Sequence, residues 1–505
     1  MSTPLQNVVK SDIDFRPAFH FAAQDTWLND PNGLIFHEGL YHLYYQNNPL
    51  DSVWGNMSWG HATSPDLLNW SEHPVAIRFD EEEDIFSGSI VFDRFNTSGF
   101  GTAENAPLIA LYTSAYKPAS PHQGTQAQSL AYSLDGGYTW TKNTQNPVLT
   151  RNTPNFRDPK VFWYQGESES YWVMVTVEAL EYRVLLHKST DLKNWEELSS
   201  FGPANATSGI WECPDLFPLA VDGDAKNIKW VLTVNLNPGG PNKGSAGQYF
   251  VGDFDGTTFT SQSTLTEGMS DGSRENEYQW LDWGRDYYAA VSFSDAPDHR
   301  RIMIGWMNNW DYANQIPTSP WRSPMSLARE VTLRSINGTP RLFQQVTHDG
   351  TTQLAPVSQF SLPASSLAEG TQVLAGGTGT VQRIDISLAP GNATEVGVVV
   401  RGNGTAGTRI GIDAQRGVLF VDRRNSGAVD FHESFASYDI APIEASNGSY
   451  DLSIYVDRCS VEVFAQDGQV TMTQLIFPEA TSRELSLFAS AGTAVLNHLS
   501  VTTYV

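Results

Sequence analysis

Short apolar or alternating runs recur along the whole chain, separated by Gly, Asn, Asp and Pro. Examples are LYHLYYQ (40–46), SIVFD (89–93), YWVMVTV (171–177) and KWVLTVN (229–235). Runs of this length, rich in β-branched and aromatic residues and bounded by turn residues, predict strands. Few segments have a sustained helical period, so the pattern predicts an all-β protein.

A recurring turn motif divides the first two-thirds of the chain into units of similar length. SPDLLNW (64–70), SLDGGYTW (133–140) and STDLKNW (189–195) share a Ser, an Asp and an aromatic residue, and GDFDGTTF (252–259) is a weaker copy. The aspartates Asp66, Asp135, Asp191 and Asp255 recur every 56 to 69 residues. This period predicts a β-propeller with one four-stranded blade per repeat, the Asp capping a hairpin and the Trp packing between blades. Unrelated hairpins with similar turns are the alternative.

The pattern changes after about residue 345. The Asp-turn motif disappears, and alternating strands take over at 381–388, 417–423, 450–457 and 459–465. Alternation with short turns is typical of an antiparallel sandwich, and a chain of 505 residues exceeds the size of a single core. We therefore expect a propeller domain over residues 1–345, a linker over 346–358 and a β-sandwich over 359–505.

The charge balance narrows the range of partners. The chain has 31 Lys and Arg against 56 Asp and Glu, a formal net charge of -25. Such an acidic chain repels nucleic acid and anionic membranes, so a neutral substrate fits better. No apolar run reaches the ~18 residues of a transmembrane helix, and the first 14 residues lack the features of a signal peptide.

Cysteine usage and glycosylation motifs point to different compartments. Cys213 and Cys459 are too few for a disulfide framework or a thiolate metal site, and both are expected to be buried. Against this cytosolic character stand eight Asn-x-Ser/Thr sequons, at Asn56, Asn69, Asn96, Asn205, Asn337, Asn392, Asn403 and Asn447. If they are used, the protein is extracellular and its leader has been removed; if they are not, a cytoplasmic bacterial protein remains an alternative.

Three acidic residues lie in short segments that also contain Pro and either Trp or Arg. Asp30 lies in WLNDPNG (27–33), Asp158 in NFRDPK (155–160) and Glu212 in WECPD (211–215). Their spacings of 128 and 54 residues approach two blades and one blade, so a propeller would bring all three to one axial cavity. Surface turns would explain the neighbouring prolines, but they would not explain the flanking Trp residues or Arg157.

These motifs resemble glycoside hydrolase family 32, and most closely its microbial exo-acting levanases and exo-inulinases. The resemblance runs from about residue 15 to the end, and rests on the three acidic motifs and on WGNMSWGHATSPDLLNW (54–70), IFSGSIVFD (85–93), LNPGGPNKGSAGQYFVGDFDGTTF (236–259), DWGRDYYAAVSF (282–293), IGWMNNWDYANQIPTSPWRSPMSLARE (304–330) and YVDRCSVEVFAQDG (455–468). It implies a five-bladed propeller followed by a β-sandwich, and retaining hydrolysis of β-D-fructofuranosyl bonds.

The resemblance also implies roles for individual residues. Asp30 resembles the nucleophile, Glu212 the general acid/base and Asp158 the stabiliser of the transition state. Seven further positions resemble residues that line the substrate pocket: Asn29, Gln46, Trp54, Ser87, Arg157, Asp215 and Trp310. Asp311 stands where a Gln is expected after that Trp, which leaves the subsite preference open.

The chemistry requires the acids to ionise differently. A retaining glycosidase needs one ionised carboxylate and one protonated carboxyl about 5–5.5 Å apart. Apolar neighbours are expected to keep Glu212 neutral, Arg157 to keep Asp158 ionised, and the amides of a turn to hold Asp30 ionised.

Several alternatives stay open at this stage. An invertase or a fructosyltransferase would use the same covalent intermediate. A lectin that has lost catalysis is the non-enzymatic alternative. A related propeller clan inverts the anomer and has its carboxyls about 6.5–9.5 Å apart. The acidic run DEEED (80–84) and His61, His73 and His122 lack metal-ligand spacing, so no cofactor or metal is expected. The expected partners are fructose-containing oligo- and polysaccharides, with no nucleic acid or membrane, and the expected state is a monomer or homodimer.

Overall fold

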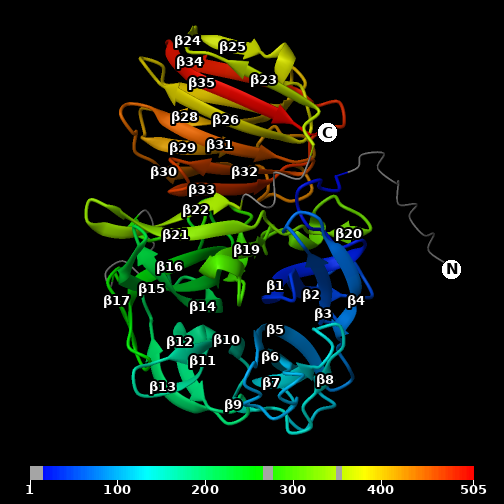
Figure 1. Cartoon of the computed structure of the whole chain (residues 1–505). Coiled ribbons are helices and arrows are strands. Elements are labelled where there is room, and N and C mark those ends of the chain that lie inside the picture. Colours follow the sequence, from blue (N-terminus) through cyan, green and yellow to red (C-terminus); the bar gives the residue numbers. More distant parts are fainter. Residues whose placement is uncertain (1–14, 266–276, 348–354, 505) are drawn as a thin grey trace, which may run out of the picture.

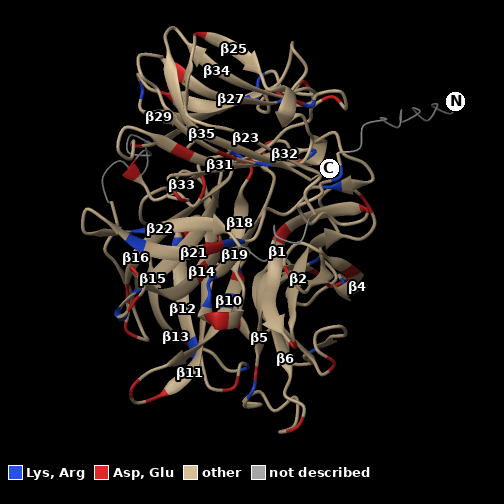
Figure 2. Cartoon of the chain, turned by 45° about the horizontal axis from the view of Figure 1, so that its top comes forward, with Lys and Arg blue, Asp and Glu red and all other residues tan. Residues whose placement is uncertain are grey.

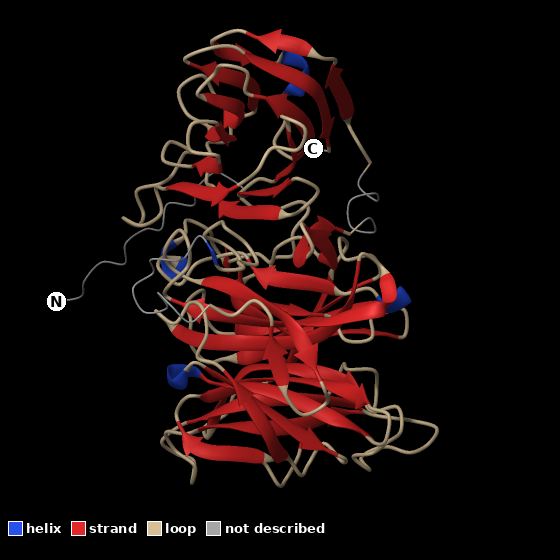
Figure 3. Cartoon of the chain, turned by 90° about the vertical axis from the view of Figure 1, so that its left-hand side faces the viewer, coloured by secondary structure: helices blue, strands red, loops and turns tan. Residues whose placement is uncertain are grey.

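The computed structural model describes residues 15–265, 277–347 and 355–504. Strands form nearly all of its regular structure, and the two domains lie one above the other (Figures 1 and 3). The first 14 residues, where no signal peptide is expected, and residues 348–354 of the expected linker lie outside the described part. The all-β prediction is confirmed.

Within the described residues, the N-terminal domain is built from five blades of four main antiparallel strands each, and a parallel pairing of Val221 with Leu333 joins the fourth and fifth blades into one sheet. The first blade contains β1 (Thr26–His37), β2 (Leu40–Asn48), β3 (Ser58–Ser64) and β4 (Ser71–Ile77). The second contains β5 (Glu83–Phe92), β6 (Leu108–Tyr116), β7 (Gln126–Ser133) and β8 (Thr141–Lys142), and β9 (Leu149–Thr153) pairs with β7. The third contains β10 (Phe156–Gln165), β11 (Ser170–Glu178), β12 (Arg183–Ser189) and β13 (Glu196–Phe201). The fourth contains β14 (Ile210–Val221), β15 (Asp224–Asn237), β16 (Ala246–Phe254) and β17 (Phe259–Ser261). The fifth contains β18 (Tyr288–Ser292), β19 (Ile302–Trp306), β21 (Arg329–Ile336) and β22 (Thr339–Val346).

The blades close into a ring around an axis formed by their first strands. Each first strand contacts the first strand of the next blade: β1 contacts β5, β5 contacts β10, β10 contacts β14, and β14 contacts β18. The ring closes where β18 contacts β1. The short strand β20 (Trp321–Arg322) pairs in parallel with β1 and adds to the closure. Four 3-10 turns are described outside the strands: η1 (Ala179–Glu181), η3 (Pro297–His299), η4 (Ala313–Gln315) and η5 (Ala375–Gly377).

The repeated Asp motif has the role predicted from its period. Each of its four copies lies between the third and fourth strands of a blade, and the Asp carboxylate accepts backbone N–H bonds from residues two to four positions later. Trp140 of the second blade packs against Tyr44 of the first, and Trp195 of the third packs on the apolar cluster of the second. The motif thus caps the hairpin and joins neighbouring blades, as predicted.

The hydrophobic core of the propeller lies between blades. One cluster joins the fifth and first blades, others join the first to the second and the second to the third, and another joins the fourth to the fifth. Because burial occurs between sheets, the inner edge of each blade remains available for polar side chains around the axis.

The C-terminal domain is a sandwich of two antiparallel sheets (Figure 1). One contains β23 (Ser358–Leu362), β24 (Ser365–Leu367), β26 (Gln382–Ala389), β31 (Tyr450–Val456), β32 (Ser460–Ala465), β33 (Val470–Leu475) and β35 (Ala494–Thr503). The other contains β25 (Gly370–Val373), β27 (Glu395–Gly402), β28 (Thr408–Asp413), β29 (Val418–Asp422), β30 (Tyr438–Pro442) and β34 (Glu484–Ser490). The chain passes between the domains from β22, which ends at Val346, to β23, which begins at Ser358.

A buried set of charged residues joins the two domains; we call it the interdomain charge cluster and define it as His20, Asp282, Arg329, Asp457 and Glu462. The His20 ring bonds Asp457 and Glu462 at 2.8 Å each, and Arg329 bonds Asp282 at 2.9 Å and Glu462 at 2.5 Å. Backbone groups approach closely here as well, since a Cβ on Gly284 would lie 2.2 Å from the carbonyl oxygen of Thr473. The domains therefore share a continuous, well-bonded interface.

Acidic and basic residues are interspersed over both domains in the view of Figure 2. Cys213 and Cys459 are both buried, as predicted, and neither is part of a disulfide bond. Within the described residues, no helix has the length and apolar character needed to cross a membrane.

Candidate active site

All five axial strands lose their regular pairing at the same depth. The register shifts between Leu28 and Pro31 in β1, between Phe86 and Gly88 in β5, and at corresponding places in β10, β14 and β18. Such bulges re-aim side chains and are common beside active sites. They place Asp30, Ser87, Asp158 and Glu212 around one end of the axis.

Asp30 is held by side chains from two blades. Ser87 Oγ donates a hydrogen bond of 2.7 Å to Asp30 Oδ2, and Asn29 Nδ2 donates one of 3.0 Å to Oδ1. Asn29 is itself held by Trp27, whose Nε1 donates to Asn29 Oδ1 at 2.7 Å. The WLNDPNG segment lies within β1 and is not the tight turn expected; Pro31 and Gly33 mark bulges in a strand.

Asp158 and Asp30 meet at the thiol of Cys213. The Cys213 Sγ lies 3.5 Å from Asp30 Oδ2 and 3.7 Å from Asp158 Oδ2, and the Cys213 backbone N–H donates to the same Asp158 oxygen at 2.9 Å. Asp158 and Cys213 both have positive φ angles, 62° and 43°. Non-glycine residues adopt this conformation at a cost, and such strain gathers at functional sites.

Glu212 completes the group of carboxylates. Arg157 Nη2 donates to Glu212 Oε1 at 3.1 Å, and the hydroxyl of Tyr288 donates to Oε2. Arg157 Nε lies 3.9 Å from Asp158 Oδ2, so one guanidinium contacts two of the three acids. The acids come from β1, β10 and β14, which confirms that the propeller gathers residues far apart in sequence.

The ionisation of the acids differs from the sequence-based expectation. Burial raises the pKa of Asp158 to about 7, against the opposing effect of Arg157, and the negative charge of Glu212 raises it further. Burial also raises the pKa of Asp30, with Glu212 adding to it and Ser87 and Asn29 opposing it. Arg157 thus opposes the rise at Asp158, as predicted, but burial is the larger effect; at Asp30 the opposing bonds come from side chains and not from the turn amides that were predicted.

Most of the predicted pocket residues lie at or beside this site. Asn29, Ser87 and Arg157 bond the acids directly, and the ring of Trp54 is 46% exposed and meets Phe86, the neighbour of Ser87, edge-on at 6.1 Å. Trp310 stacks on Trp27 with ring centroids 6.0 Å apart. Gln46 is buried and donates to Asn32 Oδ1 and to the carbonyl of Ile85, so it joins β2 to the axial strands β1 and β5.

Asp215 occupies a different place from the one predicted. Its carboxylate accepts hydrogen bonds of 2.7 Å from the backbone N–H and the hydroxyl of Ser292, and Lys160 Nζ lies 3.5 Å away. It lines a separate cavity with Trp163 and other residues from the far halves of the axial strands. The bulge after Glu212 turns Asp215 toward the opposite end of the axis.

Two residues that contact the acids had no predicted role at the site. Tyr288 lies within DWGRDYYAAVSF, one of the quoted motifs, but neither its spacing nor its type indicated that it would reach Glu212. Cys213 was expected only to fill space. Its position between Asp30 and Asp158 depends on the bulge in β14, which no local pattern predicts.

The described residues contain no cluster of three or more His, Cys, Asp or Glu side chains arranged for a metal ion. The DEEED run forms ion pairs instead: Lys142 pairs with Asp80 at 2.8 Å and with Glu83 at 2.5 Å, and Lys117 pairs with Asp84 at 2.8 Å.

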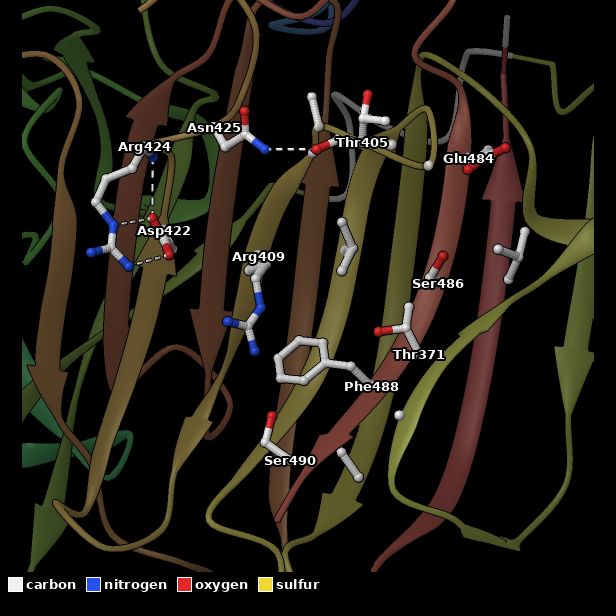
Figure 4. A pocket seen from close by; sticks show the side chains of 18 of the residues that line it. Thr371, Thr405, Arg409, Asp422, Arg424, Asn425, Glu484, Ser486, Phe488 and Ser490 are labelled. Carbon is white, nitrogen blue, oxygen red and sulfur yellow. Dashed lines mark hydrogen bonds and ion pairs between the residues drawn. The ribbon is translucent and has the colours of Figure 1, made fainter. Parts of the chain in front are cut away.

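A large surface cavity of about 680 Å³ lies far from the acids, on the outer face of one sandwich sheet (Figure 4). Figure 4 shows Arg409 beside the ring of Phe488, with an Asp422–Arg424 pair at one side. In this cavity Asp422 pairs with Arg424 at 2.7 Å, and Arg409 pairs with Glu395 at 2.9 Å. Size alone therefore does not locate the reactive groups of this molecule.

Family models match both domains of the chain. Residues 20–345 match the N-terminal domain of glycosyl hydrolases family 32, and residues 344–503 match its C-terminal domain. The levanase of Bacillus subtilis strain 168 is 43% identical over 497 residues, covering 97% of this chain and 70% of the levanase. An extracellular exo-inulinase of Aspergillus ficuum is 43% identical over 509 residues, covering 95% of this chain and 93% of that protein.

Solved structures resemble the chain over its full length. The exo-inulinase of Aspergillus awamori superimposes with a TM-score of 0.90 at 40% identity, covering 98% of this chain and 99% of the other. The β-fructofuranosidase of Schwanniomyces occidentalis, complexed with fructosyl-erythritol, gives a TM-score of 0.86 at 32% identity, covering 96% and 97%. With the propeller, the sandwich and both family matches in place, the chain belongs to glycosyl hydrolase family 32 and is a glycoside hydrolase.

Proposed function

We propose that the chain is a retaining, exo-acting β-fructofuranosidase that hydrolyses terminal β-D-fructofuranosyl bonds of levan, inulin and sucrose. The observation that carries this proposal is the meeting of Asp30, Asp158 and Glu212 at one end of the propeller axis. The names of the similar proteins, levanase, exo-inulinase and β-fructofuranosidase, support the substrate class.

In the first half of the proposed reaction, a carboxylate oxygen of Asp30 attacks the anomeric carbon of the terminal fructosyl unit. The bond to the leaving oxygen breaks, and Glu212 donates its proton to that oxygen. In the second half, Glu212 takes a proton from water, the oxygen of that water attacks the anomeric carbon, and the ester to Asp30 breaks. Two displacements at one carbon retain the anomeric configuration.

The proton that Glu212 needs is available within the carboxyl group cluster. Burial raises the pKa of Asp158 to about 7 and also raises the pKa of Asp30, so these two carboxyls hold a proton more readily than exposed ones. We infer that bound sugar places this proton on Glu212, because the leaving oxygen then becomes its acceptor. Tyr288 and Arg157 position the Glu212 carboxyl by bonding one oxygen each.

Asp158 is proposed to stabilise positive charge and to bind sugar hydroxyls. Its Oδ2 accepts from the Cys213 N–H, and its own backbone N–H donates to Thr113 Oγ1 at 2.9 Å, so its position is fixed from two sides. Developing positive charge on the sugar ring favours the ionised form of Asp158, which the free site disfavours. The interaction is thus stronger in the transition state than in the free enzyme, which is what catalysis requires.

An extracellular location is part of the proposal. Similar proteins include extracellular exo-inulinases, and several sequon residues, such as Asn392 and Asn447, lie on exposed surface. Asn205 is fully buried, so the folded protein leaves no room for a glycan on its side chain. A monomer or homodimer stays the expected assembly.

A product time course on levan, inulin and sucrose tests the proposed activity. Release of fructose alone from the first minute supports exo action, whereas longer fructo-oligosaccharides at early times would contradict it. NMR of the first-formed anomer tests retention, and an inverted anomer would rule out the ester to Asp30. Oligomers that grow at high sucrose would indicate a fructosyltransferase, and no release from any substrate would indicate a lectin.

A further inference from the structure

A second cavity lies at the end of the propeller axis opposite the candidate acids. It has a volume of about 400 Å³ and is lined by the far halves of β5, β10 and β14, by Trp230 of β15 and by the segments that follow β5 and β18. Lys160 follows Asp158 by two residues on β10, and Asp215 follows Glu212 by three on β14. The same strands therefore supply both sites, at different depths.

Asp215 contributes an unused acceptor to this cavity. Its Oδ2 atom accepts both bonds from Ser292 and lies 3.5 Å from Lys160 Nζ, whereas its Oδ1 atom has no hydrogen-bond partner among the described residues. The Asp215 side chain is 1% exposed. A buried carboxylate oxygen without a donor costs free energy, so a bound group that donates a hydrogen bond would relieve this cost.

Arg301 contributes an unused donor to the same cavity. Its Nη1 donates to Ser292 Oγ at 3.1 Å, and its Nε has no acceptor among the described residues although it is buried. Lys160 donates to the carbonyl oxygen of Ser292 and Arg301 donates to its hydroxyl, while Lys160 also pairs with Asp215. Within the described residues, the unpartnered Asp215 Oδ1 is an acceptor and the unpartnered Arg301 Nε is a donor, and a hydroxyl group can serve both kinds of atom.

Aromatic side chains form the wall and rim. Phe95 is 66% exposed and lies with its ring centroid 6.0 Å from that of Trp163, and Trp230 lies across the cavity next to Phe162 at 5.6 Å. Partly exposed indole and phenyl faces pack well against the C–H surfaces of sugars. An Arg94–Asp295 pair of 2.9 Å closes one part of the rim.

We propose that this cavity is a second saccharide-binding site, distinct from the catalytic one, that takes a fructosyl unit of the substrate or product. The charged residues that line it, Arg94, Lys160, Arg301, Asp215 and Asp295, nearly balance, which favours a neutral polyhydroxylated ligand over an ion. The presence of a sugar site follows from the hydroxyl pattern and the aromatic wall. The identity of the sugar rests on the proposed function.

The experiment uses the full chain with Asp30→Ala, so that substrate is bound but not consumed. Calorimetric titration with short inulin oligosaccharides is expected to give two sites per chain. Hydrogen exchange is expected to slow at residues 91–95 and 160–165 when the sugar is added. Phe95→Ala and Trp163→Ala, each added to this chain, should weaken the second site about tenfold and leave the first unchanged.

The matched control is Tyr138→Ala, which removes a 44% exposed aromatic ring from a loop outside the cavity and should leave both sites intact. In chains that keep Asp30, Phe95→Ala should leave kcat and KM for sucrose unchanged. One site in the parent chain, or a second site that survives both cavity variants, would overturn the proposal, as would protection of these segments by inorganic phosphate but not by sugar. Failure of the proposed function appears separately, as lack of sucrose turnover in the unaltered chain.

Discussion

Two buried groups of charged residues in this molecule invite comparison. The proposed catalytic group combines Asp30, Asp158 and Glu212 with one guanidinium, that of Arg157. The interdomain charge cluster also contains three carboxylates, but two cationic side chains, His20 and Arg329, lie among them. Both lie within or against the propeller, and both are largely shielded from water.

The acids of the two groups ionise in opposite ways. Hydrogen bonds from His20 and from the Phe19 and Ala18 amides lower the pKa of Asp457 in spite of its burial. Arg329 and His20 likewise lower the pKa of Glu462. The pKa of His20 rises to about 9, because bonds and charge from Asp457 and Glu462 outweigh its burial. In the catalytic group, by contrast, burial raises the pKa of Asp30 and of Asp158.

The difference shows that burial alone does not distinguish a structural acid from a reactive one. Asp457 and Glu462 have enough donors to lower their pKa values in spite of burial, and their bonds join the two domains. In the other group one guanidinium serves three acids, so burial raises the pKa of Asp30 and Asp158, and positive charge that develops on a substrate would stabilise their ionised forms. This missing counter-charge is the feature that we propose makes the group of Asp30, Asp158 and Glu212 reactive.

Asp30→Ala is expected to have the largest effect, a loss of turnover on the order of 10⁴-fold or more, because no other group can form the ester. Thermal unfolding should change little, since the substitution removes an acid that burial already disfavours. Sucrose hydrolysis and calorimetry measure the two quantities. The control Asp135→Ala, in a blade hairpin, should keep its turnover; an active Asp30→Ala chain would remove the distinction between the two groups.

Arg329→Met is expected to reverse that pattern, with a loss of about 3–5 kcal/mol in the free energy of unfolding, because Glu462 and Asp282 remain buried without their cation. Urea denaturation measures it. Arg334→Met on the same strand breaks an exposed pair with Asp467 and should cost less than about 1 kcal/mol. Equal losses in the two variants would mean that the interdomain charge cluster is not a special contributor to stability.

Tyr288→Phe is expected to lower kcat/KM by about 10- to 100-fold and to move the limbs of the pH–rate profile, because Glu212 loses a donor. Tyr287→Phe is the matched control, since the neighbouring Tyr287 hydroxyl is buried without a partner in the described structure. A profile that changes equally in both variants would show a structural effect and not positioning of Glu212.

The smallest expected effect is a pH-dependent change in stability. The folded-state pKa of Asp158, about 7, lies above its unfolded value of 3.8, so its favourable contribution is complete below pH 3.8 and is lost as the pH rises through 7. Asp158→Asn should therefore match the parent Tm at pH 4 and exceed it at pH 8, by on the order of 2 °C.

His20→Gln provides the counterpart in the interdomain charge cluster. The contribution of His20 is complete below pH 6.5 and is lost as the pH rises through about 9. This variant should have a lower Tm than the parent at pH 6, and the difference should shrink above pH 9. A constant difference across this range would mean that His20 acts through packing and not through charge.

Much of the fold could be predicted because strands, turns and the Asp repeat are local. Asp66 and its three counterparts indicate hairpins, because the motif lies within about five residues of each Asp. The alternation of residues 381–388 likewise indicates a strand of the sandwich. The convergence of Asp30, Asp158 and Glu212 was predictable as well, because their spacing followed the blade period and their motifs resembled a known family.

The contacts of individual side chains were less predictable. Asp215 was assigned to the wrong end of the axis because a bulge of one strand changes which way the following residues point. The same bulge brings Cys213 between Asp30 and Asp158, and the closing of the ring brings Tyr288 of the fifth blade to Glu212 of the fourth. Such arrangements depend on neighbouring strands that lie far away in the sequence.

By itself, the sequence determined that the chain forms blades, that a sandwich follows them and that three acids occupy equivalent depths. Only the tertiary structure decided how those acids ionise and which donors serve them. The physical reason is that strand pairing and hairpins arise from nearby residues, whereas a pKa depends on burial and on the sum of all charges that the closed ring brings together.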